Sequence, residues 1–149
     1  MGAPDRHSHV VDCRMMAGPE RLDAFAMMKR FRTDEALLGD ALSLFVDRED
    51  LGFVWLAYRD DFPVGCCCVG YVIGTDAGGV IAVVRDIYVL PEDRRQGVAK
   101  AMLESLAERV NGIDVRRIDV PVAGDPGLQA FLLATGYHAT DDQLFSLYR

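Results

Sequence analysis

Residues 84–100 read VRDIYVLPEDRRQGVAK, a stretch that passes from an apolar run through a polar loop into an amphipathic segment. A helix start leaves backbone N–H groups unpaired and carries a partial positive charge, so a strand, loop and helix in this order can hold a phosphate or pyrophosphate. Gly97 lets the backbone approach phosphate oxygens, and the small Ala99 leaves space beside it. Arg94 and Arg95 add cationic donors. The alternative is an ordinary strand-to-helix loop with solvated arginines.

Other phosphate-binding patterns are missing from this stretch. Lys100 is not preceded by glycine and is followed by Ala101, so there is no GxxxxGK(S/T) loop, and no GxGxxG pattern is present. In the apolar part, Val84, Ile87 and Val89 are spaced three and then two residues apart, which breaks strict alternation and indicates a β-bulge.

Hydrophobic periodicity on both sides of the loop predicts one layer of mixed α/β sheet with helices on its faces. The almost wholly apolar residues 80–89 suit a central strand buried on both faces. Residues 59–63 have the chemistry of a hairpin turn. Strands are expected at residues 10–14, 53–58, 64–73, 80–89 and 118–122, around Tyr137 and at 144–148, and helices from Pro19, after an N-cap at Thr33, at 98–110 and at 128–134.

Length and composition favour a single globular domain. The chain has 149 residues, of which 50% are hydrophobic and 26% charged, close to the average for globular proteins. We expect one domain at residues 10–149 behind a mobile tail at residues 1–9. The tail has no apolar stretch typical of a secretion signal, which makes the cytoplasm the expected location. The longest apolar run, residues 64–73, is interrupted by Gly65 and Gly70 and is too short to cross a membrane.

The net charge and the spacing of the cysteines and histidines indicate which kinds of ligand the protein is expected to bind. A net charge of −7 argues against nucleic acid and is compatible with a cationic small substrate. Cys13 and the three cysteines at residues 66–68 have no CxxC spacing, so we expect small apolar side chains in a buried strand. His7, His9 and His138 form no ligand spacing either, and no metal site is expected.

The pattern Arg94-x-x-Gly97-x-Ala99 resembles the acetyl-CoA signature (R/Q)xxGx(G/A) of the GNAT superfamily of N-acetyltransferases. The resemblance extends over nearly the whole chain: residues 59–65 are similar to the family's second hairpin, and residues 131–137 to its late helix followed by a glycine and an aromatic residue. It implies an α/β (α+β) fold, with a mixed, mostly antiparallel and splayed sheet of about seven strands and helices on both faces.

The resemblance also implies acetyl-CoA as co-substrate and places its binding residues. Backbone groups of Ile87 and Val89 are expected to pair with the pantetheine arm like an added strand, and the Val89 N–H to polarise the thioester carbonyl. An amine, once deprotonated, then attacks the acetyl carbon directly, with no covalent enzyme intermediate. The residues expected to hold the cofactor in the loop are Arg94, Arg95, Gln96, Gly97, Val98, Ala99 and Lys100.

Asp86 is the candidate general base, acting through water. The strand around it is similar to that of the diamine and polyamine acetyltransferase branch, although Arg85 replaces an acidic residue of that branch. The alternative role for Asp86 is a structural ion pair with Arg85 or Arg117.

Leu132 stands where family members often have a tyrosine that protonates the departing thiolate. Tyr88 and Tyr137 are therefore the candidate general acids, with packing aromatics as the alternative. Asp125 replaces a frequent asparagine at the start of the late helix and is expected to cap that helix.

The sequence thus predicts an N-acetyltransferase that acts on the primary amine of a small molecule. One alternative is a catalytically weak acyl-CoA-binding or regulatory domain of the same family, and another is a protein N-terminus or lysine as the acceptor. The apolar last strand, at residues 144–147, is suited to pairing across a homodimer.

Overall fold

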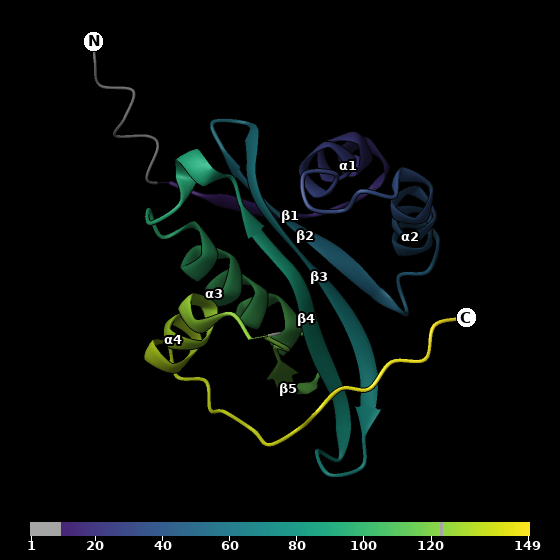
Figure 1. Ribbon diagram of the computed structural model, residues 1–149, viewed down its shortest axis with the longest axis vertical. Coiled ribbons are helices and arrows are strands. Elements are labelled where there is room, and N and C mark those ends of the chain that lie inside the picture. Colours follow the sequence, from purple (N-terminus) through teal and green to yellow (C-terminus); the bar gives the residue numbers. More distant parts are fainter. Residues whose placement is uncertain (1–9, 123) are drawn as a thin grey trace.

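A computed structural model describes residues 10–122 and 124–149, so the tail expected at residues 1–9 lies outside the described residues (Figure 1). The strands are β1 (Asp12–Met15), β2 (Gly52–Arg59), β3 (Phe62–Gly74), β4 (Gly79–Val89) and β5 (Val115–Asp119). The α-helices are α1 (Arg21–Met28), α2 (Glu35–Asp47), α3 (Val98–Asn111) and α4 (Pro126–Ala134). Short 3₁₀ turns, η2 (Gly18–Glu20) and η3 (Pro91–Asp93), precede α1 and follow β4.

The sheet has the strand order β1-β2-β3-β4-β5. Neighbouring strands are antiparallel except for β4 and β5, which run parallel. Helices α1 and α2 lie on one side of the sheet and α3 and α4 on the other (Figure 1). The predicted mixed, mostly antiparallel sheet with helices on both faces is confirmed.

Local sequence explains the turn between β2 and β3 and two helix starts. Arg59 pairs with Phe62, and both intervening aspartates, at positions 60 and 61, have positive φ angles of 52° and 66°, as in the two-residue turns that match strand twist. Asp125 caps α4 as predicted, by accepting from the Leu128 N–H. The predicted cap at Thr33 is wrong by one residue, because the Asp34 carboxylate accepts the Leu37 N–H of α2.

The two expected last strands are wrong: the described part of the chain has five strands, and none follows α4. Gly136 has a φ of +100°. Its N–H donates a hydrogen bond to the Leu133 carbonyl, and the Tyr137 N–H donates one to the Leu132 carbonyl. This is a Schellman cap, so Tyr137 closes α4 instead of opening a strand. Residues 144–148 have no partner strand, and a short strand is unstable alone.

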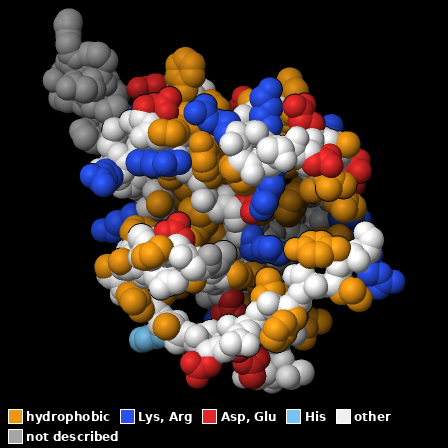
Figure 2. Space-filling model, viewed as in Figure 1, with side chains coloured by type: hydrophobic (Ala, Val, Ile, Leu, Met, Phe, Trp, Pro, Cys, Tyr) orange, Lys and Arg blue, Asp and Glu red, His pale blue; other side chains and the backbone are white. Residues whose placement is uncertain are grey.

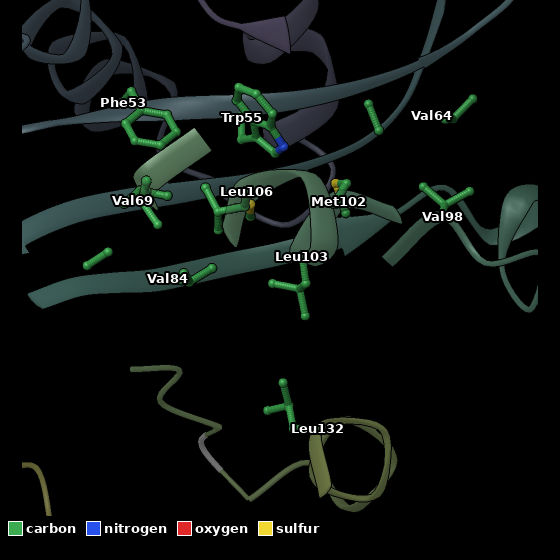
Figure 3. Close-up of a cluster of buried hydrophobic side chains, with 14 residues drawn as sticks. Phe53, Trp55, Val64, Val69, Val84, Val98, Met102, Leu103, Leu106 and Leu132 are labelled. Atoms are coloured by element: carbon green, nitrogen blue, oxygen red, sulfur yellow. The ribbon is translucent and has the colours of Figure 1, made fainter. Parts of the chain in front are cut away.

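The sheet separates two hydrophobic clusters, and alternation along β3 divides the cysteines between them. Cys67 belongs to the cluster under α3 and α4, part of which Figure 3 shows, whereas Cys66 and Cys68 belong to the cluster under α1 and α2. All three are buried and free, which confirms the predicted buried strand. Burial raises the pKa of each thiol, that of Cys68 to about 12.

The predicted bulge in β4 is present. Cys66 pairs with Tyr88 and Cys68 with Arg85, so two residues of β4 lie opposite Cys67, and Asp86 takes a positive φ of 57°. A bulge of one residue exchanges the faces of the side chains that follow it. Tyr88 therefore packs on the α1 and α2 side, whereas Ile87 packs with Val84 on the α3 side.

Candidate active site

The second half of β4 faces a gap in the sheet. Pairing between β4 and β5 ends at Val83 and Asp119, so among the described residues no strand lies on that side of β4 from Val84 onward. This explains why its last residues are only partly buried, contrary to the expectation of a strand buried on both faces. The Leu90 N–H donates to the Val64 carbonyl at 2.9 Å, and alternation along the ladder turns the backbone of Val89 away from β3, toward the gap.

The loop between η3 and α3 presents a row of backbone donors. Within the described residues, none of the N–H groups of residues 95–100 donates to another backbone group, and the first such bond of α3 joins the Ala101 N–H to the Gly97 carbonyl at 2.9 Å. Arg95 and Gly97 both have positive φ angles, of 63° and 81°. A side chain at Gly97 would meet nothing within 4 Å, so the loop surrounds open space. The loop therefore fits a pyrophosphate bound by backbone N–H groups.

Arg94 links the end of β4 to this loop. Its Nε donates to the Val89 carbonyl at 2.9 Å, and its guanidinium lies 5.4 Å from the centre of the Tyr88 ring. The guanidinium is exposed beside the loop, where its remaining N–H groups are available to an anion. In the view of Figure 2, Lys and Arg side chains lie over the hollowed middle of the molecule, although the whole chain is acidic.

Arg59, at the end of β2, contacts the loop through its side chain. The sequence did not predict this role. The residue is buried, and its Nη1 donates to Asp93 at 2.6 Å and to the Gln96 side chain at 3.0 Å. Its Nε and Nη2 are buried without a partner within the described residues. No sequence signal identifies these contacts, because Asp93 and Gln96 lie 34 and 37 residues further along the chain.

Asp86 and Tyr88 lie on one side of β4, facing the segment after α1. Asp86 forms an ion pair with Arg32, and not with Arg85 or Arg117, the partners named in the alternative to a role as base. Arg117 instead pairs with Asp76 and Asp119, each at 2.9 Å.

Aromatic packing and a second arginine hold Tyr88 in place. Its ring lies 4.9 Å from that of Phe31, and Arg30 Nε donates to its hydroxyl at 3.3 Å. The sequence did not indicate Arg30 or Arg32 as site residues, since they follow α1 and are brought to β4 by the fold.

Tyr137, the other candidate acid, lies on the opposite side of the sheet. It packs against the cluster under α3 and α4, which also contains Leu132. Burial raises the pKa of the Tyr137 phenol above its usual value. The structure thus brings Asp86 and Tyr88 together and leaves Tyr137 on the other face.

In residues 10–122 and 124–149, no set of three or more His, Cys, Asp and Glu side chains is arranged to bind a metal. The same part of the chain contains no helix with the length and hydropathy needed to cross a membrane.

Comparison with known proteins identifies the family. The acetyltransferase (GNAT) domain model matches residues 50–138. No curated protein matches the chain. Solved structures match its fold, and those named here share between 15% and 22% of their residues with this chain. AAC(6')-Iy, an aminoglycoside N-acetyltransferase solved with a CoA bisubstrate analogue, has a TM-score of 0.79 at 22% identity, covering 94% of this chain and 99% of that one.

Two further structures show the same fold. A ribosomal-protein-alanine N-acetyltransferase from Brucella melitensis biovar Abortus 2308 has a TM-score of 0.76 at 15% identity, covering 94% of this chain and 99% of that one. A predicted acetyltransferase with acetyl-CoA from Clostridium acetobutylicum has a TM-score of 0.76 at 15% identity, with coverages of 93% and 96%.

The fold and the donor-lined loop define a domain of the acetyltransferase class. The chain belongs to the GNAT family and is an acetyl-CoA-dependent acetyltransferase.

Replacing Gly97 by tryptophan should weaken acetyl-CoA binding. The new side chain enters the space that the free N–H groups surround, and each lost hydrogen bond to a charged phosphate is worth about 1.5–3 kcal/mol, or about tenfold or more in affinity. Calorimetric titration with acetyl-CoA measures the change.

The control for this substitution is Gly124→Trp. Gly124 also has a positive φ, of 78°, with nothing within 4 Å of an added Cβ, so it carries the same backbone strain outside the loop. Unchanged acetyl-CoA affinity in a folded Gly97→Trp variant would show that the loop does not hold the pyrophosphate.

Replacing Arg59 by methionine should loosen the loop without touching the gap beside β4. We expect about tenfold weaker binding of CoA and unchanged binding of pantetheine, which lacks the pyrophosphate. Titration of both ligands checks this difference. Arg48→Met, which removes an exposed ion pair with Asp50, is the matched control. Equal losses for both ligands would mean that Arg59 supports the fold as a whole rather than the loop.

Proposed function

We propose that this acetyltransferase transfers the acetyl group of acetyl-CoA to the primary amine of a small molecule by direct attack. The observation that carries the proposal is the continuity of the unpaired half of β4 with the donor-lined loop at residues 95–100. An elongated molecule in which an arm is followed by a pyrophosphate can bind both, because the gap offers backbone groups for the arm and the loop offers N–H groups for phosphates.

Backbone groups carry most of the proposed cofactor contacts. The backbone of Ile87 and Val89 pairs with the pantetheine arm along the gap, and the Val89 N–H points at the thioester carbonyl and stabilises charge that develops on its oxygen. The side chains of Ile87 and Val89 pack against the cluster under α3 and α4. Val98, whose side chain is 2% exposed, anchors the start of α3, while its N–H remains free for the pyrophosphate.

Asp86 is proposed to receive the proton of the incoming ammonium through a water molecule. The neutral nitrogen attacks the acetyl carbon and forms the new C–N bond. The C–S bond breaks, and its electron pair leaves with sulfur. The nitrogen releases its second proton to water, which leaves a neutral amide. Arg32 now pairs with Asp86, and its side chain is half-exposed. A cationic amine is able to replace Arg32 as the partner of the carboxylate.

Tyr88 is the proposed proton donor to the departing sulfur. It lies on the same side of β4 as Asp86, and its hydroxyl is oriented by Arg30. Tyr137 is on the other side of the sheet, and burial raises the pKa of its phenol above the usual value. A thiol ionises near pH 8.5, so the release of a thiolate depends less on an acid than the release of an amine does.

Different relatives favour different acceptors. The aminoglycoside N-acetyltransferase supports a small polar amine, and the ribosomal-protein-alanine N-acetyltransferase supports a protein N-terminus as the second candidate. A catalytically weak acyl-CoA-binding domain is the third candidate function, since Leu132 is buried and its side chain has no acidic proton to donate.

A cytoplasmic location remains a prediction. So does a homodimer, for which Leu144 and Leu147, 77% and 83% exposed, offer apolar surface.

Amine-dependent release of thiol from acetyl-CoA should be detectable with a colorimetric thiol reagent. We expect diamines and polyamines to be acetylated in preference to acidic amino acids, and the preference to weaken as salt rises, because the chain is acidic and salt screens exposed charge. Retention of acetyl-CoA without amine-dependent thiol would support the binding domain instead. A preference for acidic amino acids would contradict the role given to Asp86.

Phenylalanine replacements at Tyr88 and Tyr137 separate the candidate acids. A positioned acid is typically worth ~10²–10⁴-fold, so we expect a loss of this order in the maximal rate for Tyr88→Phe and a small loss for Tyr137→Phe. The rate is followed across pH, with acetyl-CoA affinity measured in parallel. The reverse order would assign the acid to Tyr137, and two small losses would indicate unassisted release of the thiolate. Leu132→Tyr then tests whether α4 lies beside the sulfur.

A further inference from the structure

A cavity of about 360 Å³ lies between α1, α2 and the bulge of β4. Its volume is in the range of pockets that bind small molecules. It reaches Cys68 and Asp86 on the sheet, so it opens on the same side of β4 as the proposed base. No residue of the proposed cofactor loop lines it, which leaves it free for the second substrate.

The walls of this cavity are apolar and come mainly from one face of α2. Leu38 and Leu42, 7% and 1% exposed, form its base, and Leu37, 67% exposed, stands at its edge. Phe31 and Phe45 add aromatic surface. An apolar side chain or ring placed here loses its contact with water, which favours binding roughly in proportion to the area covered.

Charged groups are few in this cavity and lie close to Asp86. The charged side chains that line it are Arg32, Asp34 and Asp86. Asp34 is already used to cap α2, since it accepts the Leu37 N–H at 3.0 Å. Asp86 is paired with Arg32. One carboxylate is thus able to receive one ammonium, whereas a polyamine would place its further charges against Arg32 or the apolar wall.

We propose, on the basis of the function proposed above, that the acceptor is a monoamine with an apolar body, such as an alkylamine or arylalkylamine. The apolar body occupies the cavity on α2. Its ammonium displaces Arg32 from Asp86, and the deprotonated nitrogen then faces the acetyl group held beside Val89. The inference concerns the chemistry of the acceptor and is independent of whether Tyr88 or Tyr137 supplies a proton.

A homologous series of amines tests the proposal on the unaltered protein. Ethanolamine, n-propylamine, n-butylamine, n-hexylamine and 2-phenylethylamine are compared with spermidine and neamine for kcat/KM. Burial of a methylene changes an equilibrium about fourfold, so kcat/KM should rise about threefold to fourfold for each added methylene until the cavity is filled. A flat series, or a preference for spermidine or neamine over n-hexylamine, would overturn the proposal.

Two substitutions on α2 test whether the amine binds in this cavity. Ala41 lines the cavity and is exposed, so Ala41→Trp should fill its mouth and lower kcat/KM for n-hexylamine at least tenfold, with the KM for acetyl-CoA unchanged. Ala36 is an exposed alanine of the same helix outside the cavity lining, and Ala36→Trp should change neither value. Equal effects of both variants, or none from Ala41→Trp, would overturn the placement.

Binding measured without turnover separates this inference from the proposed function. Calorimetric titration with 2-phenylethylamine should show an affinity that Ala41→Trp abolishes and Ala36→Trp preserves. Such binding without any acetylation would contradict the proposed function and leave the cavity assignment standing. Acetylation of polar amines together with no binding of 2-phenylethylamine would support the proposed function and contradict the assignment of the cavity to an apolar amine.

Discussion

The separation of β4 from β5 after Val83 is the constraint on which the site depends. Backbone N–H and C=O groups that leave water must find hydrogen-bond partners, and β4 continues past this point without a neighbour on one side. If β5 continued to pair with β4, the backbone N–H and C=O groups of β4 after Val83 would be hydrogen-bonded within the sheet. The splayed sheet keeps them available at a fixed position. A ligand arm with its own amides is able to pair with them, so the gap suits the extended, peptide-like cofactor arm proposed above better than a compact molecule.

The bulge at Asp86 acts on the same strand in a different way. It moves the chain by one residue relative to β3, so that Ile87 and Val89 pack against α3 while Asp86 and Tyr88 face α1 and α2. The backbone proposed to bind the cofactor arm and the side chains proposed for proton transfer therefore come from alternate positions of one strand. Strain at the positive φ of Asp86 is compatible with a functional site, where such conformations are commonly found.

Local patterns predicted most of the fold, and their failures have local causes. The spacing of Val84, Ile87 and Val89 was sufficient to predict the bulge, because an extra residue in a strand shifts the alternation of side chains by one position. Tyr137 was assigned to a strand because a Schellman cap and a strand start share a glycine followed by an apolar residue. In the site, the loop could be predicted from its glycine and helix start, but Arg59, Arg30 and Arg32 could not, because their partners are distant in sequence.

Charge is distributed unevenly between the site and the rest of the chain, and this distribution bears on how the substrates bind. The net charge of −7 draws cations toward the molecule in general, while Arg94 and Arg95 stand at the loop that would receive an anion. Arg32 and Asp86 satisfy each other in the unliganded protein. A pair at a half-exposed surface contributes little to stability, so exchange of Arg32 for a substrate ammonium costs little. Asp86 is thereby able to pair with Arg32 in the unliganded protein and with the ammonium of the proposed substrate in its place.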